Sequence, residues 1–425
     1  MSDVLSILGF LAGVLLLVAE VVLVLLAGYL LFLTAAAVVV WLTRPGERLG
    51  ADGPLRQATG EAGRVPAPGR WPAPRTRFKV LVPAHDEELL IRRVVGSLLA
   101  VDYPPELYQV HVIADNCTDR TAQLARAAGA IVHERQDATQ RGKGYALRWL
   151  FAQLLRDPAS GDAFVIVDAD STVNQGFLRA LDRRLGGDTV AIQAYGTVLN
   201  LGASWGTALR YVAFALLHYL RPLGRKLFDG SAGLKGNGMC FRRDLLERMD
   251  WGAFSVTEDL QFHLDVLLRG RVVEFAPDAV VWSEMPGSLK AAHAQNIRWE
   301  TGRLELVENY VPRLLREAIK RRWFPLFDAA MEQIIPPFSA TFAAAAVVLV
   351  AAVFWGNPLA IGLALFALLG QVVYTLTGLW LAQAPAKVYL ALLYAPFYVV
   401  WKLVMWLPMI VGKRHRSAEW VRTAR

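Results

Sequence analysis

Long apolar runs stand at both ends of the chain and enclose a central region in which short apolar stretches alternate with polar ones. The first run extends from Val4 to Leu42, and three more cover residues 337–355, 359–382 and 387–411. A transmembrane helix needs about 20 apolar residues, so each run is long enough to cross a bilayer. The pattern predicts six segments: a transmembrane segment (1–42), an irregular linker (43–77), an α/β domain (78–315), an interfacial helical region (316–336), transmembrane or re-entrant helices (337–411) and a basic cytosolic tail (412–425).

The basic residues favour a cytosolic position for the α/β domain. The chain has 425 residues and a net charge of +8, and Lys and Arg crowd the stretches that flank the apolar runs. Such flanks usually remain on the cytosolic side of a membrane. We therefore expect a multi-pass protein of the cell membrane that contacts membrane lipids. No nucleic-acid-binding signature accompanies the positive charge, so we expect no nucleic-acid partner.

The expected number of membrane crossings indicates that one of the three C-terminal runs does not cross completely. If the α/β domain and the tail are both cytosolic, an even number of helices must cross between them, whereas three runs are long enough. The third run carries Lys402 near its middle together with Pro396 and Pro408. We therefore expect this run to lie in the interface or to re-enter the membrane. The first run is expected to be one span with an extension, because no polar turn divides it.

Three short apolar stretches in the central region each end in polar residues. Residues 78–82, 109–114 and 163–167 have the length and the β-branched content of buried strands, and helical patterns separate them. This alternation predicts an α/β fold. Ligands bind at the carboxyl ends of the strands in open α/β sheets, so the residues after each stretch are candidates for a site.

Asp168 and Asp170 follow the third stretch directly and are separated by one residue. Two carboxylates at a strand end can hold a hard divalent cation, which can bridge the oxygens of a diphosphate. Two aspartates in a surface turn are a common alternative, and for this pair alone that is the better interpretation. The metal-site hypothesis therefore depends on whether other segments supply the rest of a donor site.

The segments upstream of this pair supply candidate donor contacts. Pro83 and Glu87 follow the first strand, in a stretch whose acidic residues 86–88 are expected at the start of a helix, where the helix dipole favours them whatever their function. Asp115 ends the second strand, where its carboxylate could accept from a nucleotide base. Lys143, in the sequence Arg-Gly-Lys-Gly, opens a predicted helix and could approach a phosphate.

A glycine-rich loop and an acidic pair lie downstream. We expect the loop of Gly236, Asn237 and Gly238 to pack closely near a sugar or an acceptor. Glu258 and Asp259 begin an amphipathic helix, and inverting transfer to a hydroxyl needs a carboxylate base opposite the leaving group. An acidic helix N-terminus capped by Thr257 is the alternative interpretation.

The last motif reads Gln-Asn-Ile-Arg-Trp at residues 295–299. Arg298 could stabilise a departing diphosphate, and the ring of Trp299 could form a platform for a sugar. Gln295 lies on the same predicted helix. The alternative is that these residues are simply an interface feature of a helix close to the membrane.

Taken in this order, the motifs resemble those of the processive-type family 2 glycosyltransferases, which include cellulose, hyaluronan and poly-N-acetylglucosamine synthases and the related ceramide glucosyltransferases. The shared pattern is an Asp after the second strand, a D-x-D, a T/E-E-D and a Q-x-x-R-W, over roughly residues 78–310. The resemblance implies a GT-A (Rossmann-like) fold, an inverting hexosyltransferase, a UDP-sugar donor and Mg²⁺ or Mn²⁺. It also implies these roles: uracil recognition by Asp115, diphosphate and metal binding by Asp168 and Asp170, the base at Asp259, and an acceptor and diphosphate site lined by Gln295, Arg298 and Trp299.

The resemblance leaves the acceptor open. The second motif reads Asp-Asn-Cys-Thr-Asp at residues 115–119 where Asp-Asp-Gly-Ser-Thr-Asp is commoner, and the apolar runs are fewer than in cellulose synthase. The leading expectation is extension of a β-linked polysaccharide, for which a homo-oligomer or an accessory membrane subunit would help to enclose a polymer path. The alternative is transfer of one sugar to a lipid of the ceramide, diacylglycerol or hopanoid type. A non-catalytic membrane scaffold or transport component is the alternative from another class.

Overall fold

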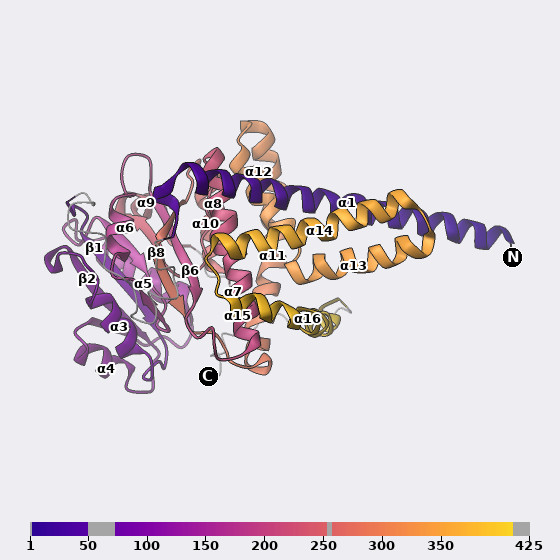
Figure 1. The fold of residues 1–425 in the computed structure, drawn as a ribbon. Coiled ribbons are helices and arrows are strands. Elements are labelled where there is room, and N and C mark those ends of the chain that lie inside the picture. Colours follow the sequence, from indigo (N-terminus) through magenta and orange to yellow (C-terminus); the bar gives the residue numbers. More distant parts are fainter. Residues whose placement is uncertain (1, 50–72, 253–256, 411–425) are drawn as a thin grey trace.

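The computed structural model describes residues 2–49, 73–252 and 257–410, which form a sheet-centred domain joined to a bundle of long helices (Figure 1). The long helices extend away from the sheet, and two further helices lie between the sheet and the bundle (Figure 1). The bounds are α1 (Ser2–Thr43), α13 (Phe338–Trp355) and α14 (Pro358–Leu381) in the bundle, with α11 (Leu289–Arg321) and α12 (Phe324–Ile334) at the junction.

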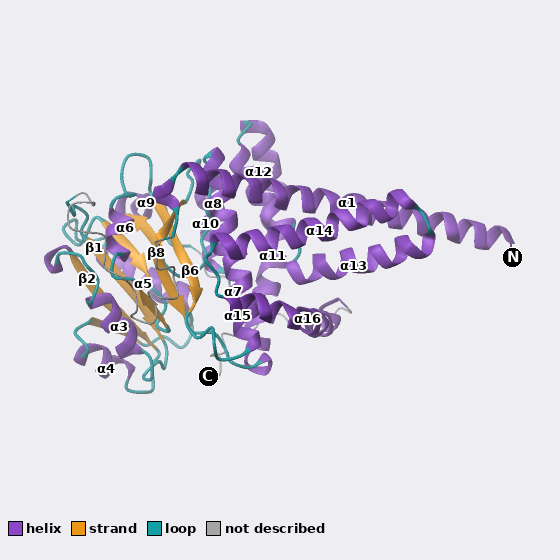
Figure 2. Ribbon diagram, in the orientation of Figure 1, coloured by secondary structure: helices purple, strands orange, loops and turns teal. Residues whose placement is uncertain are grey.

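The sheet has eight strands within the described residues, in the order β3-β2-β1-β4-β7-β6-β8-β5 (Figure 2). Strands β3, β2, β1 and β4 are parallel neighbours, β7 is antiparallel to both β4 and β6, β8 is parallel to β6, and β5 is antiparallel to β8. The bounds are β1 (Phe78–Ala84), β2 (Tyr108–Asp115), β3 (Ile131–Arg135), β4 (Ala163–Ile166), β5 (Ser171–Val173), β6 (Ala191–Val198), β7 (Met239–Arg242) and β8 (Glu274–Ser283).

Helices cover both faces of this sheet because alternate strand residues are buried on opposite sides. Leu81 belongs to a core that includes Leu150 of a helix on one face, and Val80 belongs to a second core that includes Val94 of a helix on the other. The predicted α/β class is confirmed. The helices of this domain are α3 (Ile91–Leu99), α4 (Thr121–Ala127), α5 (Lys143–Leu154), α6 (Phe177–Asp182), α7 (Trp205–Phe214), α8 (Arg221–Arg225), α9 (Arg243–Arg248) and α10 (Glu258–Leu268).

The three predicted strands correspond to β1, β2 and β4, and their register places their carboxyl ends at one edge. Ala84 pairs with Ala114, and Leu81 pairs with Ile166. Strand β1 continues through Pro83, which was expected to end it. Pro83 lies past the last residue that pairs with β4, a position near a strand end where proline is tolerated.

The acidic stretch after β1 does not begin a helix, so that expectation was wrong. Helix α3 begins at Ile91, and Asp86 has a left-handed backbone with φ of 52°. Its carboxylate accepts from the main-chain N–H of Thr118 at 2.7 Å. This bond ties the loop after β1 to the loop after β2 and competes with helix formation.

Within the described residues, four helical stretches are long and apolar enough to cross a membrane: residues 10–43, 338–355, 358–381 and 386–405. Large apolar side chains such as Phe10, Leu15, Val347 and Leu369 are exposed on them, as expected of helices that face lipid. Helix α1 is one continuous helix of 42 residues, as expected from the absence of a polar turn. At 1.5 Å per residue it measures roughly 63 Å, about twice the thickness of a bilayer core.

The bundle helices pack closely through small residues. A Cβ atom added to Gly370 of α14 would lie 3.2 Å from Leu31 and 3.4 Å from Ala27 of α1. A Cβ atom added to Gly224 of α8 would overlap the carbonyl oxygen of Leu33. Helix α1 therefore packs directly against both the bundle and the sheet domain.

The third C-terminal run is helical throughout and tightens into a 3₁₀ turn near its start. It consists of α15 (Ala386–Ala391), a 3₁₀ turn η5 (Leu392–Tyr394) and α16 (Ala395–Ile410). Pro396 stands in the first turn of α16, where proline leaves no helical bond unmade.

A buried ionic cluster fixes the bundle to the sheet domain. Arg225 of α8 donates to Asp328 and to Glu332 of α12, each at 2.7 Å, and the hydroxyl of Tyr29 on α1 donates to Asp328. Arg221 donates to Glu332 at 3.1 Å. Such a cluster is stable only when each charge is paired, so α1, α8 and α12 hold fixed positions relative to one another.

Some predicted segments lie partly or wholly outside the described residues. These are most of the linker, at 50–72, and the basic tail at 412–425. Helix α11 passes without a break through residue 315, where the α/β domain was expected to end.

Candidate active site

A cavity of about 1370 Å³ opens at the carboxyl edge of the sheet and continues towards the long apolar helices. Most of the residues singled out from the sequence line it, although they come from segments far apart in the chain. These are Pro83, Glu87, Asp115, Lys143, Asp168, Asp170, Gly236, Glu258, Asp259, Gln295 and Trp299.

Three predicted site residues are not in this lining. Asn237 and Gly238 lie behind the cavity wall, and the side chain of Arg298 falls outside the described part of the structure. The two loop residues shape the site in another way. The main-chain N–H of Asp168 donates to Asn237 Oδ1 at 3.1 Å, and Asn237 Nδ2 donates to Ser171 at 2.7 Å and to Ser283 at 2.9 Å. Asn237 therefore holds the strand end that carries Asp168.

Five acidic residues of the lining form what we call the acidic wall: Asp115, Asp168, Asp170, Glu258 and Asp259. Lys143 lies among them. It begins α5 after Gly142, whose φ of 114° lets the chain turn into the helix. Its Nζ donates to Asp168 Oδ1 at 2.6 Å and to the carbonyl of Gly236, and it lies 3.9 Å from Glu258. Burial alone would lower the pKa of Lys143, but the Asp168 and Glu258 carboxylates outweigh it and raise the pKa, so the ammonium stays charged.

Asp168 and Asp170 suit a divalent cation. Both offer carboxylate oxygens to the cavity, and Ser171 donates to Asp170 Oδ1 at 2.9 Å. Oxygen donors of this kind are preferred by Mg²⁺ and Mn²⁺, which usually bind to one or two carboxylates together with substrate phosphates. These two residues therefore fit a cation shared with a diphosphate.

A second group of potential metal ligands lies near the loops after β1 and β2. Asp86, Cys117 and Asp119 each offer an atom within 4.8 Å of the others. Asp119 Oδ1 accepts from the main-chain N–H of Thr121 at 2.8 Å, and Asp86 accepts from the loop after β2. These carboxylates already order the two loops, and we give this group no metal role.

Asp115 is held by a basic residue that sequence reasoning missed. Arg135 at the end of β3 donates to Asp115 Oδ1 at 2.6 Å, and both side chains are buried. The ring of His85 lies 2.7 Å from the main-chain oxygen of Asp115. Strands β2 and β3 are parallel neighbours, and their register places Arg135 opposite Asp115. Assigning residues 131–135 to a strand from the sequence would have identified this partner.

Glu258 and Asp259 begin α10 and face the cavity beside Lys143. Burial and the adjacent Asp259 carboxylate raise the pKa of Glu258 to about 7, although Lys143 opposes the shift. Burial also raises the pKa of Asp259. A Cβ atom added to Gly236 would lie 3.2 Å from Asp259 Oδ2, so the glycine loop packs directly against this carboxylate. A carboxylate with a raised pKa accepts a proton near neutral pH more readily than an ordinary one.

The alternative of a capped helix N-terminus finds little support. Thr257 occupies the cap position, but its side chain makes no capping hydrogen bond, and its buried hydroxyl has no partner among the residues that the structure describes. Thr257 instead packs against Gly302 of α11, where a Cβ atom would lie 2.7 Å from Thr257 Cγ2. This close approach brings α10 and α11 together.

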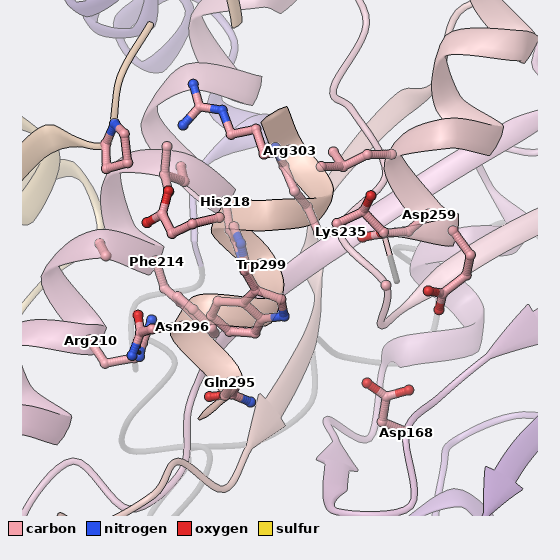
Figure 3. A pocket seen from close by; sticks show the side chains of 18 of the residues that line it. Asp168, Arg210, Phe214, His218, Lys235, Asp259, Gln295, Asn296, Trp299 and Arg303 are labelled. Carbon is pink, nitrogen blue, oxygen red and sulfur yellow. Dashed lines mark hydrogen bonds between the residues drawn. The ribbon is translucent and has the colours of Figure 1, made fainter. Parts of the chain in front are cut away.

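Trp299 stands between Asp259 and Asp168 on one side and Phe214 and Arg210 on the other (Figure 3). Its ring is 36% exposed, and the guanidinium of Arg210 on α7 lies 5.1 Å from the ring centre. Gln295, one turn earlier on α11, has a buried oxygen without a hydrogen-bond partner in the described residues. An exposed indole beside an unpaired amide is suited to binding a hydroxyl-rich molecule.

Two further residues that the sequence did not single out, Arg303 and Lys235, bind the lining elements together. Arg303 of α11 donates to the main-chain oxygens of Glu332 and Gln333 at the end of α12, at 3.1 and 3.0 Å. Lys235 faces the cavity and lies 3.9 Å from Glu332. Their partners are distant in sequence, so no local pattern reveals them.

Two curated relatives share the sheet domain. The chain is 28% identical over 252 residues to a beta-monoglucosyldiacylglycerol synthase of Synechocystis, covering 57% of this chain and 50% of the relative. It is 25% identical over 271 residues to a poly-beta-1,6-N-acetyl-D-glucosamine synthase of Staphylococcus aureus, covering 60% of each. The match thus spans about half to three-fifths of these relatives.

Among solved structures, a mannosyltransferase of Pyrobaculum calidifontis in complex with GDP-Man and Mn²⁺ superposes with a TM-score of 0.48 and 19% identity, covering 81% of this chain and 97% of that one.

The family model described as "Glycosyltransferase like family 2" matches residues 74–302, more than half of the 425 residues. The matched region contains β1 to β8 and the whole acidic wall of the cavity. The mixed sheet flanked by helices is the GT-A arrangement that the motifs implied. The family match sets aside the non-catalytic alternative: the chain is an enzyme and belongs to the family 2 glycosyltransferases.

Proposed function

We propose that this enzyme transfers one sugar, with inversion, from a UDP-sugar to the hydroxyl of a membrane lipid. The observation that carries the proposal is the continuity of one cavity, which runs from Asp168 and Asp259 to apolar side chains of the membrane helices. A polar donor and an apolar acceptor can therefore meet in the same space. This differs from the leading expectation from the sequence, which was polymer extension.

The acidic wall suits the donor. Asp115, oriented by Arg135, is the proposed partner of the uracil, and Lys143 with Asp168 and Asp170 would hold the diphosphate. Pro83 and Glu87 line the same end of the cavity and are proposed donor contacts. Mg²⁺ or Mn²⁺ held by Asp168 and Asp170 would neutralise the charge that develops on the leaving diphosphate.

Asp259 is the proposed base. Its carboxylate would accept the proton of the acceptor hydroxyl while that oxygen bonds to the anomeric carbon. The bond from that carbon to the diphosphate breaks on the opposite face, so UDP departs and the configuration inverts. Glu258 is adjacent to Asp259 and also faces the cavity. Burial raises the pKa of both carboxyl groups. Arg298 remains a proposed diphosphate contact.

The membrane side of the cavity favours a lipid over a polymer. Its lining there is largely aliphatic and aromatic, with Leu209, Val212, Phe342, Val372 and Leu376 among its members. In the described residues, α1 packs directly on α14 through Ala27 and Gly370. A growing polysaccharide would need a path through this bundle, whereas a lipid needs only an opening beside it.

Polymer extension is the second candidate, because the exposed ring of Trp299 provides a platform on which a terminal sugar could stack. A similar chain from Staphylococcus aureus is named a poly-beta-1,6-N-acetyl-D-glucosamine synthase. In that case an oligomer or accessory subunit would have to supply the polymer path.

We further propose that the enzyme lies in the cell membrane with its sheet domain in the cytosol. In this arrangement α13 and α14 cross as a pair, and the third run lies at the interface. The position of Lys402 in the middle of the third run supports this topology.

A donor and acceptor screen tests the function. Purified enzyme in detergent is supplied with each of a panel of UDP-sugars and with diacylglycerol, ceramide or a hopanoid alcohol, and products are analysed by mass spectrometry. The expected product is a lipid heavier by one hexose unit. A ladder of masses would establish polymer extension instead, and no sugar transfer from any UDP-sugar would contradict the proposed donor.

A further inference from the structure

The cavity has an arm that the donor and the base do not use. It lies beyond Trp299, on the side of Phe214 and away from Asp259 (Figure 3). We call it the apolar arm and define it by these lining residues: Phe214, Phe338, Phe342, Leu376, Leu392 and Val399. They come from α7, α13, α14, η5 and α16, so the arm lies where the sheet domain meets the membrane helices.

One wall of the apolar arm is a single helix. Ala395, Tyr398, Val399 and Lys402 of α16 line the cavity, and their spacing of three and four residues places them on one helix face. The opposite face carries residues such as Phe397 (71% exposed), Val400 (60%) and Val404 (59%). Helix α16 thus separates the cavity from the surroundings, and its outer face is apolar enough to contact hydrocarbon.

A buried ion pair fixes this wall. Lys402 is the one charged residue in the α16 sequence, and its Nζ lies 3.0 Å from Glu300 Oε1. The two side chains are only 8% and 16% exposed. Glu300 follows Trp299 on α11, so the pair links the wall to the helix that carries the indole platform. The ring of Tyr394 also stacks on Trp205 of α7, with centroids 5.8 Å apart.

An ion pair in apolar surroundings is costly to break, because either partner alone would be a buried unpaired charge. Lys402 would not be stable in an apolar helix without Glu300. The pair therefore determines where α16 lies relative to Trp299, and so how wide the apolar arm is.

We propose that the apolar arm binds the hydrocarbon chains of the acceptor lipid, and that the Lys402–Glu300 pair positions α16 as its wall. The lipid hydroxyl would lie near Trp299 and Asp259 while its chains pass along Phe214 and Val399 towards the bilayer. The inference rests on the proposed transfer to a lipid.

Two adjacent valines offer a matched test. Val399 faces the arm and Val400 faces outward, so Val399→Trp fills the arm whereas Val400→Trp changes only the outer face. The probe is a diacylglycerol with a photoreactive group at the end of one chain, and labelled peptides are identified by mass spectrometry. UDP binding, measured by calorimetry, reports that each variant is folded.

In the wild type we expect labelling of residues that line the arm. We expect Val399→Trp to lose at least tenfold in this labelling and in transfer to dioleoylglycerol, with UDP binding unchanged. Val400→Trp should stay within twofold of the wild type in both. Equal behaviour of the two variants, or labelling confined to the outer face of α16, would overturn the assignment.

The ion pair is tested by charge reversal. Lys402→Glu and Glu300→Lys should each lower transfer to dioleoylglycerol at least tenfold through a higher KM, and the double variant should recover to within about threefold. A double variant that binds UDP but recovers nothing would exclude the positioning role.

The two hypotheses fail differently. A wild type that glycosylates lipid but shows no difference between Val399→Trp and Val400→Trp contradicts the apolar arm alone. Labelling of the arm without transfer to any lipid contradicts the proposed function and leaves the binding site standing.

Discussion

The ammonium of Lys143 lies 2.6 Å from the carboxylate of Asp168, and the same ammonium donates to the carbonyl of Gly236. One side chain thus joins the start of α5, the end of β4 and the glycine loop before β7. Each of these segments is a weak signal in the sequence alone. Their contact at one edge of the sheet makes the donor half of the site a single structure.

Replacement of Lys143 tests this contact. Lys143→Ala should lower transfer by about ten- to a hundredfold, because a positive charge aimed at the diphosphate is lost. Lys143→Arg should retain part of the activity. Arg148→Ala is the matched control: Arg148 is on the same helix and pairs with Asp250 at the surface, 3.2 Å away. A surface ion pair of this kind contributes little to stability. The initial rate of Arg148→Ala with a saturating acceptor should therefore stay within twofold of the wild type. An equal loss of rate in Lys143→Ala and Arg148→Ala would contradict the donor role of Lys143.

Removal of divalent cations should abolish transfer. Asp168 and Asp170 are the proposed ligands, so excess chelator should stop product formation and added Mg²⁺ or Mn²⁺ should restore it. Asp170→Asn should need a higher metal concentration for half-maximal rate. Full activity in excess chelator would contradict the metal role of the pair.

The acid pair predicts a pH dependence. The pKa of Glu258 is raised to about 7, mainly by burial, and burial raises that of Asp259 as well. A base must be deprotonated, and a raised pKa keeps Asp259 protonated to a higher pH than an ordinary aspartate, so kcat/KM should rise with pH on the acid side and level off later than an unperturbed carboxylate would allow.

The variant Glu258→Gln tests which of the two acids sets this limb. Burial raises the pKa of Asp259, and Glu258, with a pKa of about 7, is itself largely protonated below neutral pH, so a neutral glutamine should leave the acid limb in place. A limb that moves to lower pH in Glu258→Gln would show that Glu258, and not Asp259, is the titrating group.

Gly238 should be intolerant of a side chain. Its φ is 68°, and a Cβ atom would lie 2.8 Å from both Ala194 Cβ and Val281 Cγ2. Gly238→Ala should therefore lower the free energy of unfolding by about 2 kcal/mol or more. Thermal unfolding in detergent, followed by intrinsic fluorescence, would measure this loss.

Two glycines separate the causes of that loss. Gly270 has a φ of 77° with nothing within 4 Å, so Gly270→Ala reports backbone strain alone. Gly96 lies in α3 with open space around it, and Gly96→Ala should be neutral or stabilising by up to about 1 kcal/mol. A Gly238→Ala variant as stable as the Gly270→Ala variant would refute the packing argument.

The sequence predicts that the proposed donor residues converge, because they follow strands. Asp115 and Asp168 stand at the ends of apolar stretches whose length alone identifies them, and parallel pairing then brings them together. The helix start at Lys143 was equally visible from the glycines around it. The long apolar runs were visible by length and composition.

The junction with the membrane helices could not be predicted in the same way. Lys402 and Glu300 are 102 residues apart, and Arg225 and Asp328 are 103 apart. Nothing in the local pattern couples them, because their pairing depends on how the bundle packs on the sheet domain. Asn237 was assigned to the acceptor side from its place between two glycines, whereas its hydrogen bonds hold the strand end of Asp168.

The most direct test of the account is a paired measurement on Asp259→Asn. This change keeps the shape of the side chain and removes its capacity to accept a proton, so transfer should fall by about 10²- to 10⁴-fold while the Kd for UDP changes less than threefold. The two quantities are measured on the same purified sample, by product mass and by calorimetry. A variant that binds UDP and transfers sugar as fast as the wild type would contradict the assignment of the base and the convergence of donor and acceptor on this carboxylate.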